Sequence, residues 1–465
     1  MRTYKLKTRG NKQLFIILGL LAVSLTMSCK KFLDAKPNDK LNTPETPADL
    51  QAMLDNAGIM NNKSPTYDEV SADDYFLTSE NYALLALRGQ AAYLWEPWPN
   101  EHPNEWGRAA EIIYATNVCL EAAEKQINGG TPAKDLANIQ GSALFYRAFT
   151  WLRQLWVYSQ AYDDATAKAD LGIVIRKTAD FNVPSERSNV EDCYAQILAD
   201  LLQAVELLPD RPEHVLRPSK AAAYGLLARA YLSMRKYDLA LANAEKCLAI
   251  KSDLIDYNTI NAAANSPFQS YNTEVIFHAD VVTFSYGNLF ITSGMVDTLL
   301  YQSYNTNDLR KSVYYAATGK YNYFKGTYIS RAVGGNTLFM GLATDEIYLM
   351  KAECFARLGK TDQAMETLNL LMKKRWKNAV PYPTLTAANQ ATALDIILKE
   401  RRKELLFRGL RWMDIKRLNK EGYQIGIKRI LGGKTYTLAP NSERFALPIP
   451  IDIIKIGGIP QNPGW

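Results

Sequence analysis

The sequence predicts a mainly α-helical protein built on tetratricopeptide-like helical pairs, with one large irregular insertion. Three observations predict this class. Apolar and small residues recur at helical spacing over most of the chain after residue 67, two segments repeat one arrangement of alanines and rings, and residues 252–341 lack that periodicity. The 465 residues, 47% of them hydrophobic and 22% charged, are enough for a large core. We therefore expect a single domain over residues 67–465.

The helical repeat occurs in two clear copies. Each places an alanine where two antiparallel helices cross and a bulky ring beside it, as close helix packing requires. Weaker helical patterns cover residues 105–126, 137–158 and 188–208, and the last opens with a capping box of Ser188 and Glu191. The first clear copy contains Leu227, Ala228, Tyr231, Tyr237, Ala240, Ala244 and Cys247, and the second contains Lys351, Ala352, Phe355, Gly359, Ala364, Leu368 and Leu371.

Residues 252–341 differ from the repeats that flank them. They are rich in Asn, Thr, Ser, Gly and Tyr and show no sustained 3.6-residue period. We expect loops, short helices and a few short strands there, such as residues 274–278. A long irregular segment inside a helical protein is usually functional. Residues 422–450 are also irregular, with a strand expected over residues 434–438.

The N-terminus has the pattern of a secretory signal. Five basic residues precede a twelve-residue apolar run from Leu14 to Leu25, which is too short to span a bilayer. Ser28 and Cys29 resemble the bacterial lipobox, so we expect residues 1–28 to be removed and Cys29 to carry the lipid, whose acyl chains anchor the protein on a bilayer. The alternative is an ordinary cleaved signal with an incidental cysteine. Residues 29–66, polar and punctuated by prolines, predict a tether with one short helix over 47–57.

The net charge gives no support for nucleic-acid binding. The chain carries a formal charge of +6, but without residues 1–28 it has 49 basic and 48 acidic residues. A nucleic-acid-binding surface needs a basic excess that attracts phosphates, and almost none remains. We therefore expect no nucleic-acid partner.

The four cysteines beyond the signal segment indicate neither a metal site nor a redox site. They lie far apart in sequence, each within a helical apolar pattern, and show no Cys-x-x-Cys or Cys/His ligand spacing. We expect no metal or cofactor, and buried free thiols rather than a disulfide. In an exported protein a disulfide is the alternative. These residues are Cys119, Cys193, Cys247 and Cys354.

The sequence gives poor support for catalysis. Its three histidines are far apart, and it has no zinc-protease, serine-hydrolase, phosphate-loop or EF-hand pattern. The adjacent carboxylates Asp73-Asp74 and Asp163-Asp164 are expected to be loop or cap residues on a solvated surface. We expect no enzyme; a glycoside hydrolase with an unrecognised carboxylate pair is the minor alternative.

Aromatic residues gather in two places. The chain has 27 Tyr and 8 Trp, and one group occupies residues 93–106 together with prolines and amides. The prolines keep this loop stiff, so we do not expect all of its rings to retreat into a core, and flat rings beside amide groups suit a saccharide. The alternative is that the rings cover the edge of the helical core. The candidate ligand-binding residues are Trp95, Trp98, Asn100 and Trp106 in the loop and Tyr301, Tyr304 and Tyr323 in the insertion, which we expect to face the loop across a groove.

Three ordered motifs close the chain. They are a basic segment from Glu400 to Asp414, the run Leu447-Pro448-Ile449-Pro450 and the tail from Gln461 to Trp465. Together they resemble the C-terminus of the SusD/RagB family of outer-membrane nutrient-binding lipoproteins, and the sequence after Cys29 is similar to the usual start of the mature proteins. We expect the basic segment to be a helix in which Glu404 and Arg408 pair and which staples the fold. The alternative role is ligand contact by Arg402 or Arg411.

The resemblance implies a function as well as a SusD-like fold. It implies a lipid-anchored protein on the outer membrane, facing the cell surface, that captures a glycan or oligosaccharide and delivers it to a SusC-like TonB-dependent transporter. No family motif maps the ligand contacts onto single residues. The alternatives are the same role for peptides, a lipid-anchored repeat scaffold that binds a protein and, least favoured, the glycoside hydrolase.

Overall fold

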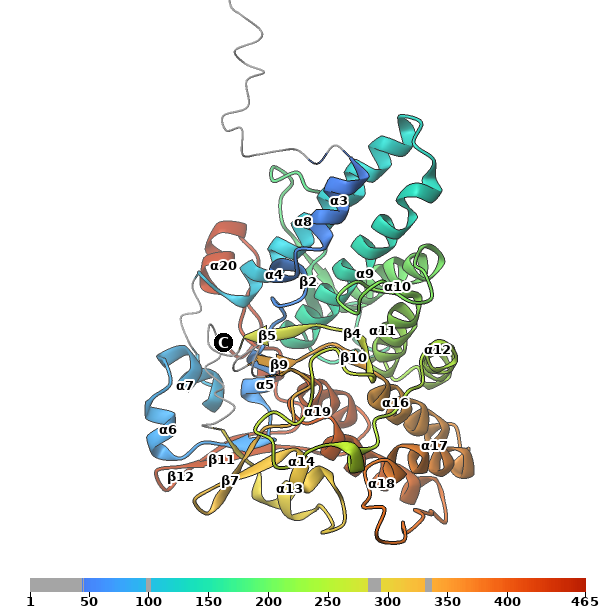
Figure 1. Ribbon diagram of the computed structural model, residues 1–465. Helices are drawn as coiled ribbons and strands as arrows, with labels where there is room; N and C mark the ends of the chain where they lie inside the picture. Colours follow the sequence, from blue (N-terminus) through green and yellow to red (C-terminus); the bar gives the residue numbers. More distant parts are fainter. Residues whose placement is uncertain (1–43, 45, 98–101, 283–293, 331–336) are drawn as a thin grey trace, which may run out of the picture. The chain divides into compact units, whose positions relative to one another are not determined.

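The structure is a computed structural model that describes residues 44, 46–97, 102–282, 294–330 and 337–465. Residues Thr46–Trp465 form one compact unit, drawn in colour in Figure 1. Helices dominate this unit, and its strands are short. The predicted lipid attachment residue, Cys29, lies outside the described residues.

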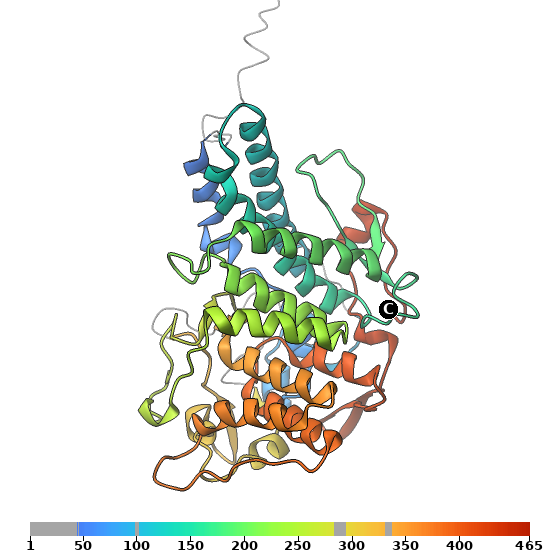
Figure 2. The ribbon, with the colours of Figure 1, turned by 90° about the vertical axis from the view of Figure 1, so that its right-hand side faces the viewer.

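Eight helices pack side by side in chain order and form the scaffold (Figure 2). The predicted helical pairs are confirmed by α11 with α12 and by α16 with α17. Helix α12 packs directly on α16, so the array continues across the long segment that separates these two helices in sequence. The helices are α8 (Glu105–Asn128), α9 (Ala133–Tyr158), α10 (Val190–Leu207), α11 (Lys220–Ser233), α12 (Tyr237–Ile250), α16 (Thr344–Arg357), α17 (Thr361–Lys373) and α18 (Gln390–Glu404).

Small residues allow the two clear pairs to approach closely. Ala228, Ala240 and Ala244 are fully buried in the first pair, and Ala352 and Ala364 are fully buried in the second. Both turns use a left-handed residue, Arg235 (φ 62°) in the first pair and Gly359 (φ 75°) in the second. The repeat pattern in the sequence thus corresponds to real helix crossings.

The helix starts follow capping chemistry. Asn104, Ser219 and Asn389 cap α8, α11 and α18 through their side-chain oxygens. The capping box predicted at Ser188 and Glu191 is wrong by one residue, because Asn189 is the cap and accepts from the backbone of Asp192 at 2.7 Å. Ser188 belongs instead to strand β3 (Arg187–Asn189), which pairs with β2 (Leu171–Val174) and delays the start of α10.

The N-terminal part of the unit consists of five short helices and one short strand. Helix α3 begins after Thr46 in a capping box with Asp49 and packs on α8 and α9, which confirms the helix predicted there. The elements are α3 (Pro47–Leu54), α4 (Ala57–Met60), α5 (Tyr67–Ser71), β1 (Tyr75–Phe76), α6 (Ser79–Ala83) and α7 (Leu87–Leu94).

The irregular insertion is packed into the unit rather than hanging from it. Strand β4 confirms the strand predicted over residues 274–278, and one four-stranded sheet in the order β1-β6-β8-β7 joins the insertion to the N-terminal segment. The shorter pairs are β4 with β10 and β5 with β9. The elements are η1 (Tyr257–Thr259), β4 (Val275–Phe277), β5 (Asp280–Val282), β6 (Met295–Val296), α13 (Thr298–Gln302), α14 (Arg310–Val313), β7 (Tyr315–Thr318), β8 (Tyr321–Phe324), β9 (Thr337–Phe339) and β10 (Leu342–Ala343).

The C-terminal segment breaks where the sequence predicts one helix. Helix α18 ends at Glu404 and α19 starts at Arg411, because Phe407 (φ 55°) and Gly409 (φ 67°) adopt left-handed conformations. The expected pairing of Glu404 with Arg408 is therefore wrong. Glu404 pairs with arginines of α14 and the α17 end, and Arg408 pairs with a carboxylate of α16. The remaining elements are α19 (Arg411–Asn419), β11 (Ile427–Leu431), β12 (Lys434–Leu438), η2 (Glu443–Phe445) and α20 (Ile451–Gly457), and β12 confirms the predicted strand.

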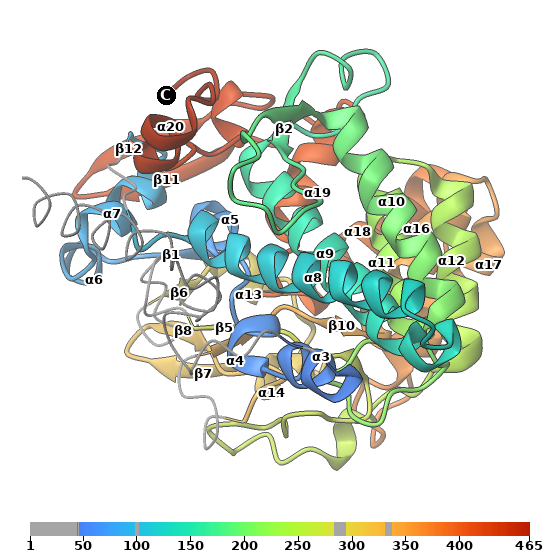
Figure 3. The same cartoon turned by 90° about the horizontal axis from the view of Figure 1, so that it is seen from above.

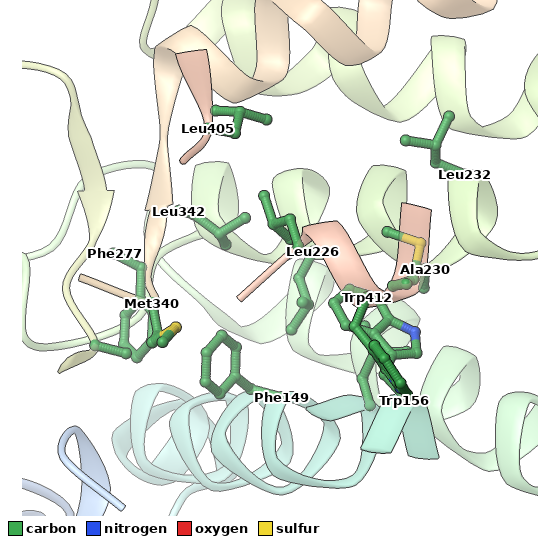
Figure 4. Close-up of a cluster of buried hydrophobic side chains, with 14 of the residues drawn as sticks. Phe149, Trp156, Leu226, Ala230, Leu232, Phe277, Met340, Leu342, Leu405 and Trp412 are labelled. Carbon is green, nitrogen blue, oxygen red and sulfur yellow. The ribbon is translucent and has the colours of Figure 1, made fainter. Parts of the chain in front are cut away.

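One core joins segments that lie far apart in sequence (Figure 4). Rings of α9 pack against aliphatic residues of α11, against residues of the insertion and against the segment around α19. The labelled members are Phe149, Trp156, Leu226, Ala230, Leu232, Phe277, Met340, Leu342, Leu405 and Trp412. Because the helical scaffold, the insertion and the C-terminal segment all contribute side chains, they are parts of the same hydrophobic core.

Largely buried ion pairs connect the C-terminal segment to the N-terminal one. Asp73, predicted to be solvated, accepts two hydrogen bonds from Arg411, and the buried Asp74 accepts one from Arg402 at 2.8 Å. The prediction of a solvated surface is therefore wrong for this pair of carboxylates. The expectation that the basic segment staples the fold agrees with these contacts, but the ion pairs are partly buried rather than exposed.

The cysteines are free, as predicted. Cys119, Cys193, Cys247 and Cys354 are all buried and form no disulfide. Burial raises the pKa of Cys119 to about 12 and that of Cys193 to about 11. Thiols held protonated in this way are poor nucleophiles and poor metal ligands.

Candidate functional site

The structure places the predicted site residues in different environments. Trp95 is buried, and its indole N–H donates to the carbonyl of Ser71 at 3.1 Å. Tyr304 is also buried, and its hydroxyl donates to the carbonyl of Lys403 at 2.6 Å. Trp98 and Asn100 lie outside the described residues. Trp106 is also buried, at 7% exposed, and so is Tyr93. The expectation that the loop rings do not all retreat into a core is therefore wrong for the described rings of the loop, which cover the edge of the helical core as in the alternative.

Tyr301 and Tyr323 are half-buried. The Tyr301 ring packs edge-on against Tyr315, with centroids 5.4 Å apart, and the ammonium of Lys311 lies 5.0 Å from it. Tyr323 lies on β8, where it pairs with Met295 of β6. Both rings keep part of their surface open to solvent.

The two predicted aromatic groups meet, but through packed rings. The guanidinium of Arg429 lies 5.1 Å from the Trp95 ring and 5.1 Å from the Tyr75 ring. Tyr75 contacts Phe407 at 6.0 Å, and Phe407 contacts Phe324 at 5.1 Å. This contact chain runs into the tyrosine cluster of the insertion. Among the described residues, these groups therefore share a core rather than facing each other across a groove.

Trp106 lies at a groove, which we call the Trp106 groove. It is a cavity of about 260 Å³ between α8, the loop before β3 and α20. Figure 3 shows α20 and the β2 region near one end of α8. The lining residues are Trp106, Ala110, Ile113, Tyr114, Gln154, Val174, Arg176, Ala179, Phe181, Ser185, Ile453, Ile456, Gly457 and Ile459.

Helix α8 supplies one wall of the groove through a single face. Trp106, Ala110, Ile113 and Tyr114 are spaced at helical intervals, so their side chains project from the same side of α8. The start of this helix is fixed by Glu105, whose carboxylate accepts from the backbone N–H groups of Thr66 (2.7 Å) and Tyr67 (3.2 Å).

Helix α20 is tied to the same end of α8. The side-chain amide of Asn104 donates to both carboxylate oxygens of Asp452, at 3.1 and 3.2 Å. Asn104 also caps α8 through its oxygen. One amide thus fixes the position of α20, and with it the aliphatic wall of the groove.

The third wall is a loop held in place from two sides. Within the loop, the guanidinium of Arg176 donates to the carbonyls of Asp180 and Val183, each at 2.8 Å. From α8, Asn117 donates to the carbonyl of Arg176 at 2.9 Å, and Glu121 accepts from the backbone of Ala179 at 2.8 Å. These bonds make the loop a preorganised wall.

An exposed aromatic pair stands at the groove. Tyr114 and Phe181 stack with centroids 4.9 Å apart and an interplanar angle of 23°. Phe181 is 78% exposed and Tyr114 is 40% exposed. Packing in the hydrophobic core therefore does not account for the contact between the two rings. A stacked, solvent-facing pair of rings is a platform for a flat apolar face of a ligand.

Gln154 of α9 adds a polar group to this apolar groove. The residue is only 2% exposed, and its side-chain amide makes no hydrogen bond with any described residue. Its amide atoms are not among the fully buried unpaired polar atoms of the described residues, so the amide is open to solvent through the groove. The amide therefore offers an NH2 group as donor and a carbonyl oxygen as acceptor to a ligand in the groove.

Only one residue of this groove, Trp106, is predicted from the sequence, and most of its lining residues are not. Trp106 was predicted, whereas Tyr114, Gln154 and Phe181 were not. Tyr114 sits in an ordinary helical pattern, and Phe181 is a single ring in a polar loop. The residues in the described part of the chain contain no cluster of His, Cys, Asp or Glu arranged to hold a metal.

Comparisons with known proteins assign the fold. One family model, described as starch-binding and associating with the outer membrane, matches residues 31–232, and the SusD family model matches residues 282–465. This chain belongs to the SusD/RagB family. A tetratricopeptide repeat model also matches residues 221–254, which cover α12 and nearly all of α11. SusD/RagB proteins are nutrient-binding proteins associated in general with the outer membrane.

The SusD-like relatives span nearly the whole chain. SusD-like protein P2 of Formosa agariphila is 23% identical over 507 residues, covering 90% of this chain and 93% of that protein. A putative sugar binding protein from Bacteroides vulgatus has a TM-score of 0.73 at 21% identity, covering 91% of this chain and all of that one. A SusD superfamily protein from Bacteroides thetaiotaomicron has a TM-score of 0.72 at 21% identity, covering 90% of this chain and all of that one. These similarities confirm the predicted SusD-like fold.

No helix formed by the described part of this SusD-like chain is long and apolar enough to cross a membrane.

Proposed function

We propose that this SusD-like protein is a nutrient-binding lipoprotein of the cell surface that captures a glycan and delivers it to a SusC-like TonB-dependent transporter. In this proposal Cys29 carries the lipid and the protein faces outward from the outer membrane. The family supports nutrient binding in general. The glycan, the transporter and the anchor are the proposed parts.

The observation that carries the proposal is the combination of stacked rings and an unpaired amide in one groove. A sugar ring presents an apolar C–H face, which packs on an aromatic ring, and hydroxyls, which need hydrogen-bond partners. Phe181 and Tyr114 offer the first kind of contact, and Gln154 offers the second. We propose these residues with Trp106 as the ligand contacts.

The other predicted contacts differ in how accessible they are to a ligand. Tyr301 and Tyr323, each partly open to solvent, remain proposed contacts at the insertion, together with Trp98 and Asn100 of the loop. Trp95 and Tyr304 are hydrogen-bonded inside the core, so contact with ligand would require them to leave it.

A binding screen tests the proposal. Purified protein from Lys30 to Trp465 is run against neutral, acidic and sulfated polysaccharides and against peptides, by affinity electrophoresis and calorimetry. Phe181→Ala is expected to weaken binding of the glycan found by about tenfold, or ~1.4 kcal/mol, because one face of the platform is lost. The matched control is Leu202→Ala on α10, which removes an exposed apolar side chain that lines no groove described above.

The alternatives give different results in the same screen. Peptide binding that depends on Phe181 would assign the groove to peptides. Full glycan binding by a folded Phe181→Ala protein would contradict the proposed contacts. We also propose that the protein is not an enzyme, and release of reducing ends from a polysaccharide by the pure protein would overturn that part.

A further inference from the structure

A second groove lies at the other end of α10. The Trp106 groove is lined by the loop that precedes β3 and α10, whereas this one is lined by residues 210–215, which follow α10 directly. Helix α10 has 18 residues, so about 27 Å separates its two ends. Figure 2 shows the connections at the two ends of this helix on opposite sides of the array. The two grooves are therefore separate.

The second groove is a cavity of about 380 Å³, which we call the Tyr271 groove. The loop after α10, the start of α11, the end of α12 and the turn before β4 each contribute to it. Its lining residues are Asp210, Arg211, Pro212, Glu213, His214, Val215, Ser219, Ala221, Ile250, Lys251, Asp253, Tyr271 and Ile276.

Tyr271 presents an exposed ring in a costly backbone conformation. Its φ is 60°, in the left-handed region where a residue with a Cβ is strained and glycine is not. Its side chain is nevertheless 42% exposed, so core packing does not account for a tyrosine here. Strain held at an exposed ring beside a cavity points to a functional constraint.

Two histidines fix the orientation of this ring. The centroid of His214 lies 4.6 Å from that of Tyr271, and the centroid of His278 lies 4.7 Å from it, both in edge contacts. His214 is itself fixed, since its Nδ1 accepts from the backbone of Leu216 at 3.2 Å. The interplanar angles of 77° and 67° make both contacts T-shaped, so the two histidines hold the ring in one orientation while part of its surface stays exposed to solvent.

Charged groups surround the groove, and their carboxylates are largely exposed to solvent. Arg211 is exposed and makes one long hydrogen bond, 3.5 Å, to the carbonyl of Ile250. Asp210 meets Lys220 at 3.5 Å, and Asp253 meets Lys251 at 3.1 Å. Carboxylates and a guanidinium around an aromatic ring supply the acceptors and donors that sugar hydroxyls require.

We propose that the Tyr271 groove is a second, independent sugar-binding site, with Tyr271 as the platform and Arg211, Asp210 and Asp253 as hydroxyl partners. The inference rests on the proposed function, since it takes the same class of ligand. A polysaccharide long enough to reach both grooves is then held at two points, which raises its apparent affinity above that of a short oligosaccharide.

The test counts sites with probes shorter than the separation of the grooves. Maltotriose, cellotriose, xylotriose and mannotriose are each titrated into the protein from Lys30 to Trp465 by equilibrium dialysis. Wild-type protein is expected to bind two molecules of a recognised trisaccharide. Tyr271→Gly and Phe181→Ala are each expected to bind one, and the double variant none.

The substitution Tyr271→Gly is suited to the test because glycine removes the ring and also relieves the strained backbone, so the fold is retained. Gln424→Gly is the matched control, since Gln424 has φ 54°, is exposed and lines neither groove. It is expected to keep both sites. Arg211→Ala, which changes only an exposed side chain, is expected to weaken the second site at least fivefold.

Each result separates the two proposals. Two sites retained in Tyr271→Gly, or a single wild-type site that Phe181→Ala abolishes, overturns the second site and leaves the proposed function standing. A single site that only Tyr271→Gly abolishes supports the Tyr271 groove and overturns the Trp106 groove. No binding of any of the four probes by wild-type protein overturns the second site, and the polysaccharide screen then decides the Trp106 groove by itself.

Discussion

Arg411 donates its Nε and Nη2 groups to the two carboxylate oxygens of Asp73, at 2.6 and 2.9 Å, across 338 positions of sequence. The pair joins α19 to the segment between α5 and β1. Burial alone would raise the pKa of Asp73, but the charge and hydrogen bonds of Arg411 outweigh it and hold this pKa below its usual range. The carboxylate therefore stays ionised at neutral pH.

Breaking this pair is expected to destabilise the protein strongly. Arg411→Met leaves the Asp73 carboxylate largely buried without its main partner, at a cost of roughly 3 kcal/mol. Urea denaturation followed by circular dichroism measures the change. Lys399→Ala is the control, because its pair with Asp395 is exposed on both sides and is worth a few tenths of a kcal/mol. Equal changes in the free energy of unfolding would show that the Arg411–Asp73 pair stabilises the fold no more than an exposed pair does.

The same pair predicts a dependence of stability on acid pH. A carboxyl whose folded pKa is depressed stabilises the fold above its unfolded pKa of about 4, and that stabilisation is lost as the pH falls below this value. Between pH 7 and pH 3, the difference in unfolding free energy between wild type and Asp73→Asn is expected to shrink. A difference that stays constant over this range would contradict the assignment.

Glu105 predicts a pH dependence of the opposite sign. Burial raises its pKa to about 7, against the hydrogen bonds from Thr66. An acid with a raised folded pKa gives its full stabilisation below the unfolded pKa, about 4.3, and loses it as the pH rises through 7. The melting temperature of wild type relative to Glu105→Gln is thus expected to fall between pH 5 and pH 8. A flat difference would show that Glu105 is ionised throughout.

Gly341 is expected to tolerate no side chain. A Cβ at this position would lie 2.0 Å from the carbonyl oxygen of Phe277, and the Gly341 carbonyl accepts from the buried Arg229 at 2.7 Å, so neither neighbour is free to move. Gly341→Ala should cost about 3 kcal/mol or prevent folding. Gly107→Ala is the contrasting control: its Cβ would make only ordinary contacts in α8, and stability should rise by about 1 kcal/mol.

Gln154 is expected to separate binding from stability. Gln154→Met keeps the length of the side chain but removes an amide with no partner among the described residues, so the free energy of unfolding should stay equal or rise slightly. Glycan affinity should fall about fivefold to thirtyfold, as for the loss of one or two hydrogen bonds. Calorimetry and thermal melting on the same samples measure both. A parallel loss of stability and binding would assign Gln154 a structural role instead.

The four buried cysteines are expected not to react with thiol reagents in the folded protein. In the protein from Lys30 to Trp465, Cys119, Cys193, Cys247 and Cys354 should not react with Ellman's reagent at pH 8, because they are buried and burial raises the pKa of each thiol. All four should react after unfolding in guanidinium. Fewer than four reactive thiols under those conditions would indicate a disulfide.

The helical repeats were predictable because their signal is local. Alanines and rings at fixed offsets report a close helix crossing, and the same offsets occur in α11 with α12 and in α16 with α17. The motifs of the C-terminal segment were predictable for a related reason, since they are short and ordered in sequence. What they do not report is backbone conformation: the left-handed Phe407 and Gly409 end a pattern that reads as one helix.

The binding groove was less predictable because its members meet only in the fold. Phe181 is a candidate contact because its ring stacks on Tyr114. Gln154 is a candidate contact because its side-chain amide lines the groove without a hydrogen-bond partner among the described residues. Neither relationship has a spacing that a sequence displays. The prediction for Trp95 was wrong for a similar reason. Proline-rich surroundings indicate a stiff loop, but they do not show that the carbonyl of Ser71 accepts a hydrogen bond from the indole N–H inside the protein.

The buried link between the two ends of the compact unit also sets an order of events during synthesis. Asp74 and its partner Arg402 are 328 positions apart in sequence. The carbonyl of Tyr75 accepts a hydrogen bond from Arg429, which lies 354 positions later. At the usual rate of translation, roughly 15–70 s pass between the emergence of these partners from the ribosome. During that interval the N-terminal carboxylates and carbonyls are hydrogen-bonded to water, and the part of the core that Arg402 and Arg429 complete cannot close. The chain therefore stays open until its last part is made, which is compatible with the export proposed above.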